Sequence, residues 1–290
     1  MLARTLGGND LIASSYTLSG SPVFQPPRFS FADRVAAAAK AGFAAIGIAV
    51  EDYIACHERG VSDAEMRRIL DDHGIAAAEI EFLTGWWEEG ERGERSRAVE
   101  ERIYQAADAF GSRHMNVGCA GERGSLPPPE KVAAKFGDLC DRAAKHGLLV
   151  ALEFLPWSDI PDVAAAGAIV GEAGRANGGI LIDTWHYFRG AADPAQVRAV
   201  PPEKFFLIQF DDADAERMGS WMEDTTDRRR LPGEGAFDLA GFIRMLDAVG
   251  VVAPFSVEIL SAEQRARTVE EAARAAYESS RAVITKARQK

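Results

Sequence analysis

Four oxygen-bearing side chains close four short apolar runs in the second half of the chain, and their types suit a metal ion. These side chains are Glu153, Asp183, Gln209 and Glu258. Three carboxylates forced together repel one another, and a bound divalent cation commonly neutralises this repulsion. Carboxylate and amide oxygens form a hard site that suits Mg²⁺, Mn²⁺ or Co²⁺ better than Zn²⁺, which favours His and Cys. The set therefore predicts a divalent-metal centre.

The spacing of the four residues indicates how they could meet. Each lies about one strand-plus-helix unit after the previous one, and the last unit is longer. In a barrel of parallel strands the carboxyl ends lie on one rim, so residues one unit apart converge. A single acidic residue at a strand end says little, because loops begin there. Four at this spacing favour an enzyme.

The rest of the chain supplies the elements that such a barrel needs. We predict strands over 11–15, 44–50, 75–82, 114–117, 148–153, 179–183, 205–209 and 255–258. Segments of helical period alternate with them, over 31–41, 64–73, 96–110, 127–145, 162–173, 194–199, 237–249 and 262–288. Strict alternation of eight strands and eight helices at this length predicts an α/β fold, a single (β/α)8 TIM barrel over 1–290.

Two polar stretches are too long for tight turns between a strand and a helix. The charged stretch 87–97 and the polar stretch 211–235 are predicted to be loops on the ligand-bearing rim, as lids or substrate loops are. Glu79 and Glu81 alternate with apolar residues just before the first of them. We expect both to be solvated where the loop begins; the alternative is that one faces the barrel mouth.

Composition narrows the partners and the compartment. A net charge of −11 and a pI near 5.1 argue against a nucleic-acid or anionic-membrane surface, which needs a basic face. The three cysteines are far apart and form no CxxC motif, which fits a reducing cytoplasm. We expect no signal peptide and no membrane span. A small-molecule substrate is predicted, and a homo-oligomer stays open.

Tryptophans flank the predicted centre. Trp157, Trp185 and Trp221 fall on the same rim and could form an apolar wall for a ring or carbon chain, or serve as ordinary packing residues. Trp86 and Trp87 follow the third predicted strand and could cap the pocket. Both sets predict an apolar side to an otherwise acidic site.

Five short motifs carry a resemblance to a known family. They are LEFLP at 152–156, IDTWH at 182–186, IQFDD at 208–212, PGEG at 232–235 and SVE at 256–258. They resemble the xylose-isomerase-like barrel superfamily, in its sugar phosphate isomerase/epimerase, hydroxypyruvate isomerase-like and 3-dehydroshikimate dehydratase-like branches. The resemblance spans nearly the whole chain and is strongest over 150–260.

The resemblance implies a role for each matching residue. Glu153, Asp183, Gln209 and Glu258 match the family's metal ligands, and the two glutamates match its acid/base carboxylates. His186 matches a histidine that contacts substrate oxygen, and Arg229 or Arg230 falls where the family places a substrate-binding arginine. Many keto-sugar epimerases have His where this chain has Gln209. Glutamine there is familiar in the isomerase-like and dehydratase-like branches.

One such site supports three outcomes. A cation that holds a carbonyl and the neighbouring hydroxyl makes the adjacent C–H more acidic, and a carboxylate can then remove the proton. Return of the proton to the other face is epimerisation, return to the next carbon is isomerisation, and loss of a β-hydroxyl is dehydration. The leading hypothesis is a metal-dependent isomerase or epimerase. The alternative is a lyase that dehydrates 3-dehydroshikimate or a keto-polyol.

Two other classes fit less well. An endonuclease of the same barrel type needs a cluster of histidines and a basic face, and the chain has five histidines, four of them outside the ligand runs. A non-catalytic binding barrel has no need of both Glu153 and Glu258.

Overall fold

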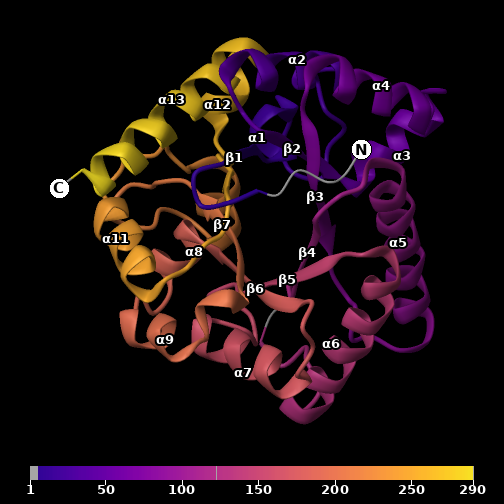
Figure 1. Cartoon of the computed structure of the whole chain (residues 1–290). Coiled ribbons are helices and arrows are strands. Elements are labelled where there is room, and N and C mark those ends of the chain that lie inside the picture. Colours follow the sequence, from indigo (N-terminus) through magenta and orange to yellow (C-terminus); the bar gives the residue numbers. More distant parts are fainter. Residues whose placement is uncertain (1–5, 122, 290) are drawn as a thin grey trace.

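The protein is a closed barrel of eight parallel strands inside a ring of helices (Figure 1). The computed structural model describes residues 6–121 and 123–289. The strands pair in chain order, and β1 closes the barrel against β8. They are β1 (Leu11–Ala13), β2 (Ala45–Ala49), β3 (Ala76–Leu83), β4 (His114–Gly118), β5 (Leu149–Glu153), β6 (Gly178–Asp183), β7 (Phe205–Phe210) and β8 (Phe255–Val257). The predicted TIM barrel is confirmed.

The strand register brings the predicted oxygen ligands to one rim. Asp183 of β6 is paired with Gln209 of β7, and Gln209 is paired in turn with Ser256 of β8. Glu153 is the last residue of β5, and Glu258 follows the last residue of β8. Because all strands run in the same direction, these four residues lie together at the carboxyl ends.

Alternation along the strands separates an apolar layer from a polar layer inside the barrel. Side chains two apart on a strand point to the same face. A small buried cluster contains Ile12, Ala151, Leu181 and Leu207. Each lies two residues before a polar side chain, respectively Ser14, Glu153, Asp183 and Gln209. The apolar layer therefore forms a floor beneath the polar side chains at the mouth.

Helices cover the outside of the barrel and also fill parts of its rim. They are α1 (Ser15–Ser19), α2 (Phe31–Ala41), α3 (Val50–Glu58), α4 (Asp63–His73), α5 (Gly90–Phe110), α6 (Pro129–Ala143), α7 (Val163–Ala173), α8 (Thr184–Arg189), α9 (Pro194–Ala199), α10 (Trp221–Asp227), α11 (Leu239–Val249), α12 (Ala262–Ala266) and α13 (Val269–Arg288). Two 3₁₀ turns, Ala144–His146 and Pro202–Lys204, precede β5 and β7.

Local capping explains several helix boundaries. The Ser62 side chain accepts a hydrogen bond from the Glu65 amide at the start of α4, and Gly74 ends that helix at φ 65°. The last predicted helix is instead two helices. The backbone of Thr268 is extended, and its side chain forms a capping box with Glu271 that starts α13 after α12 has ended.

The rim carries more helix than predicted, so strict alternation was too simple. The short helices α1, α3 and α8 begin at or just after the ends of β1, β2 and β6. Helix α10 lies within the predicted loop 211–235. Helix α5 begins at Gly90, inside the predicted loop 87–97. The short helices lack the long apolar period that marks a helix in sequence, and side-chain caps start α1, α8 and α10.

Among residues 6–121 and 123–289, none of the helices has the length and apolar character that a membrane span requires.

Candidate metal and acid–base site

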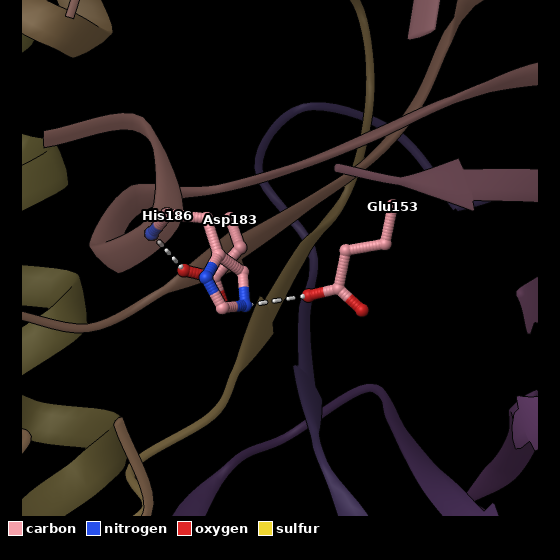
Figure 2. Close-up of side chains that lie close together, drawn as sticks. All are labelled: Glu153, Asp183 and His186. Atoms are coloured by element: carbon pink, nitrogen blue, oxygen red, sulfur yellow. Dashed lines mark hydrogen bonds and ion pairs between the residues drawn. The ribbon is translucent and has the colours of Figure 1, made fainter. Parts of the chain in front are cut away.

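Glu153, Asp183 and His186 form a cluster of potential metal ligands at the mouth of the barrel (Figure 2). One ligand atom from each lies within 4.8 Å of those of the other two, and all three residues are buried. Nε2 of His186 lies 3.1 Å from Oε1 of Glu153 and 4.0 Å from Oδ2 of Asp183. The second carboxylate oxygen of Glu153 points away from the histidine (Figure 2).

Helix α8 positions His186. Asp183 is both the last residue of β6 and the N-cap of α8, and its Oδ1 accepts a hydrogen bond from the His186 amide at 3.0 Å. The three-residue spacing from Asp183 to His186 is therefore one helical turn, which brings both side chains to the same mouth.

Gln209 and Glu258 form the neighbouring pair. Nε2 of Gln209 donates to Oε1 of Glu258 at 2.9 Å. This bond orients the amide, and Oε1 of Gln209 is buried without a hydrogen-bond partner among the described residues. A buried carbonyl oxygen without a partner is costly, so a cation or a donor belongs opposite it.

Arg229 links the two pairs. Its Nη1 donates to Oδ2 of Asp183 at 2.7 Å, to Oε2 of Glu258 at 3.2 Å and to the carboxylate of Asp211. Its Nε and Nη2 donate to the carbonyl and hydroxyl oxygens of Thr225, both at 2.9 Å. The guanidinium is thus a buried counter-ion whose three nitrogens all have protein partners.

Arg229 and Arg230, the two candidate substrate-binding arginines of the sequence analysis, have different surroundings in the structure. Arg229 lies in the site but is fully engaged by protein. Arg230 pairs with Asp214 at 3.2 Å and with Glu263 at 3.0 Å, on the partly exposed side of the rim. Neither geometry leaves the arginine free for substrate, so their substrate-binding role stays a prediction without a contact to support it.

The PGEG motif builds the turn that holds these arginines. The Asp212 carboxylate accepts hydrogen bonds from the amides of Gly233 at 2.9 Å and Phe237 at 3.1 Å. Asp212 also forms an isolated antiparallel bridge with Arg230. A Cβ at Gly235 would collide with the Asp212 carboxylate, which explains why the motif needs glycine there.

Burial and the crowded charges set the protonation of the site. Burial acts to raise the pKa of Asp183, but Arg229 and His186 outweigh it and hold that pKa below its ordinary value. Burial raises the pKa of Glu258 well above its ordinary value; Arg229 opposes the rise, and Glu81 and Asp183 add to it. Burial and the charge of Asp183 likewise raise the pKa of Asp211. The site therefore holds more acid than Arg229 alone neutralises.

Trp157, Trp185 and Trp221 gather beside His186, an arrangement that suits both an apolar wall for substrate and ordinary packing. The ring centroid of Trp157 lies 5.5 Å from that of His186 and 5.9 Å from that of Trp221. Trp185 is fully buried and lies 5.2 Å from the imidazole. Trp86 stacks edge-on against Phe136 of α6 instead of joining this group.

Three residues near the site escaped sequence reasoning or were misplaced by it. Glu79 and Glu81 are buried inside the barrel, so the expectation that they are solvated was wrong. A Cβ at Gly47 on β2 would lie 2.5 Å from Oε1 of Glu79. The glycine therefore leaves space for the Glu79 side chain, and it was the signal in the sequence that could have indicated burial of this glutamate. Tyr16 follows β1, and burial together with Glu81, Glu51 and Glu258 raises its pKa.

Comparison with known proteins agrees with this geometry. Residues 35–282 match the family described as xylose isomerase-like TIM barrel. The chain belongs to this family. The resemblance carried by the motifs at 152–258 is therefore confirmed.

The curated relatives are enzymes of two reaction types. A 3-dehydroshikimate dehydratase of Pseudomonas aeruginosa is 31% identical over 233 residues, which cover 79% of this chain but only 36% of that protein. An inosose isomerase of Bacillus velezensis is 26% identical over 253 residues, which cover 85% of this chain and 89% of that protein. These relatives support an enzyme acting on a small molecule and leave both reaction types open.

Solved structures share the fold. The IOLI protein, whose crystal structure contains a bound zinc atom, superposes with a TM-score of 0.83 at 20% identity and covers 96% of this chain and 98% of its own. A probable 3-DHS dehydratase from Bacillus anthracis superposes with a TM-score of 0.74 at 15% identity, covering 93% of this chain and 97% of its own.

Proposed function

We propose that this family member is a divalent-metal-dependent isomerase or epimerase that removes a proton next to the carbonyl of a small hydroxy-carbonyl substrate. The observation that carries the proposal is the convergence of Glu153, Asp183, Gln209 and Glu258 at one barrel mouth, with Oε1 of Gln209 buried and unpartnered among the described residues.

The residues fit a cation. Five acidic groups are buried at or near the mouth, counting Asp211 and Glu81 with the three carboxylates of the set, and Arg229 pairs with three of them, Asp183, Asp211 and Glu258. Glu153, Asp183, Gln209 and Glu258 would hold the ion, and His186 lies near enough to Asp183 and Glu153 to be a further ligand or to contact substrate. When bound, a divalent metal would polarise the substrate carbonyl and stabilise the enediolate. Mg²⁺, Mn²⁺ and Co²⁺ match the oxygen-rich set.

The two glutamates would divide the proton transfers. Glu153 keeps one oxygen against His186 and directs the other away from it, so that second oxygen is the candidate base. Glu258, the other glutamate of the set, is the candidate for returning the proton. Trp157 and Trp185 would line the apolar side of the substrate and exclude water.

Dehydration is the second candidate. The same proton removal, followed by loss of a β-hydroxyl, gives an unsaturated product, and the Pseudomonas aeruginosa relative is named for such a reaction. Glutamine at position 209 also resembles the dehydratase-like branch.

The deciding experiment is incubation of metal-loaded protein in D₂O with keto-sugars, inososes, hydroxypyruvate and 3-dehydroshikimate. Deuterium at the carbon next to the carbonyl of one substrate is expected, and the product then separates epimerisation, isomerisation and dehydration. The chelated protein is the control and should incorporate none. Exchange that continues at full rate after chelation would contradict a metal-dependent mechanism.

A further inference from the structure

A series of buried polar side chains connects Glu258 to residues inside the barrel. Ser14 Oγ lies 3.2 Å from Oε1 of Glu258 and 3.1 Å from Oε1 of Glu81. Beyond Glu81, Nδ2 of Asn116 lies 3.4 Å from Oε2 of Glu81 and 3.5 Å from Oε2 of Glu79. Oε1 of Glu79 accepts a 2.6 Å hydrogen bond from Ser256, and Oε2 of Glu79 also lies 3.4 Å from Nε2 of His114.

Ser14 is held in place on both sides. Its oxygen accepts a hydrogen bond from the Tyr16 amide at 3.3 Å, which caps α1. Oε1 of Glu81, the oxygen facing Ser14, accepts a second hydrogen bond from the Ser15 amide at 3.0 Å. The hydroxyl is fully buried, so its orientation follows from these protein partners.

The contact with Glu258 reaches the metal-facing oxygen of Gln209. Oε1 of Glu258 receives both the Ser14 hydroxyl and Nε2 of Gln209. Fixing that carboxylate oxygen fixes the Gln209 amide, whose Oε1 is the buried atom without a partner in the described part of the chain. The hydroxyl of Ser14, which directly follows β1, thus orients Glu258 and Gln209, two of the four proposed ligands.

We propose that Ser14, supported by Glu81, is a positioning residue that holds Glu258 and, through it, Gln209 in the orientation that binds the metal. The proposal rests on the proposed function, because it assumes that these two residues are ligands. Partners behind the ligands of a metal site typically change metal affinity or activity by about 10–100-fold when removed.

The test is direct titration of chelated protein with Mn²⁺, followed by electron paramagnetic resonance of the free ion. We expect Ser14→Ala to weaken Mn²⁺ binding by about 10–100-fold. Ser256→Ala is the matched control. It removes a hydroxyl that is equally buried and bonded to an inner glutamate, but one that does not reach Glu258. Its affinity should match that of the wild type, and circular dichroism of each variant establishes that it is folded.

A double-mutant cycle separates positioning from the loss of the α1 cap. If Ser14 acts through Glu258, Ser14→Ala should cost little further affinity in the Glu258→Gln background. The proposal would be overturned if Ser14→Ala lowered Mn²⁺ affinity by the same factor in the wild-type and Glu258→Gln backgrounds. It would also be overturned if Ser14→Ala and Ser256→Ala lowered Mn²⁺ affinity equally. Glu81→Gln should bind Mn²⁺ nearly as well as the wild type, since the amide can donate to the Ser14 oxygen and leave the Ser14 proton for Glu258. A loss equal to that of Ser14→Ala would mean that the charge of Glu81 holds the ion instead.

Mn²⁺ binding by the wild type distinguishes a failure of this inference from a failure of the proposed function. A wild type that binds no Mn²⁺ would contradict the proposed metal dependence itself. A wild type that binds, with Ser14→Ala binding equally well, would overturn only the role of Ser14.

Discussion

The two glutamates at the barrel mouth are alike in sequence context but differ in how the protein holds them. Glu153, at the end of β5, contacts His186 through one oxygen and lies beside the tryptophan cluster. Glu258, after β8, receives hydrogen bonds from Ser14, Gln209 and Arg229, with at least one on each oxygen. The first carboxylate is supported on one side, and the second is supported on both.

The difference teaches that equal spacing does not imply equal roles. A base must present a free oxygen to the substrate carbon, and Glu153 has one that points away from its histidine partner. A side chain held by three donors also organises the residues that bind it. Glu153 is thus the candidate for removing the proton, and Glu258 is the candidate for returning it and for orienting Gln209.

The largest effect is expected from changing each glutamate to glutamine. Glu153→Gln should lower turnover by about 10²–10⁴-fold while metal content stays near that of the wild type, because an amide still offers a ligating oxygen but no base. Glu258→Gln should lose turnover too, and metal affinity as well, since its new amide meets donors on every side. Turnover with the productive substrate and metal titration measure the two effects. Full activity in both loaded variants would leave the site without an identified base.

A smaller effect is expected from His186→Ala. The histidine contacts Glu153, so its loss should disorient the base and lower turnover by about 10–100-fold. Metal content should stay near wild type if His186 is only a positioning or substrate-contacting group. Loss of metal together with turnover would make it a ligand and would move the ion toward the Glu153 side.

The smallest effect concerns the pH dependence of stability on the Glu258 side. Burial, and then the charge of Glu79, raise the pKa of Glu81 well above its ordinary value. The stability that such a group contributes is present below its unfolded pKa and is lost as the pH rises through its folded pKa. As the pH rises above the ordinary glutamate pKa of 4.5, unfolding in urea should show the wild type losing more stability than Glu81→Gln. Glu94→Gln, on an exposed part of α5, is the control and should follow the wild type. Parallel curves for wild type and Glu81→Gln would show that Glu81 does not titrate there.

Sequence reasoning could place the four proposed ligands at one rim because simple periodicity fixes the strand ends. Asp183 and Gln209 each end an apolar run, and the barrel register then pairs them directly. Such reasoning could not foresee that all donor nitrogens of Arg229 would bind protein oxygens, because the partners Asp183 and Glu258 come from distant strands that only the barrel brings together. It also misplaced Glu79 and Glu81, since alternation alone cannot tell a barrel interior from solvent. The opposing Gly47 is a cross-strand clue that only the register reveals.

Arg229 has a consequence for how the protein is made. A pocket lined by acidic side chains would ordinarily resist closing until a cation arrived, so that folding would have to wait for metal. An arginine already bound to Asp183, Asp211 and Glu258 lowers that dependence, since the chain itself cancels part of the repulsion. The barrel can then be synthesised first and metallated afterwards, and chelation should leave its circular dichroism unchanged while lowering its unfolding temperature.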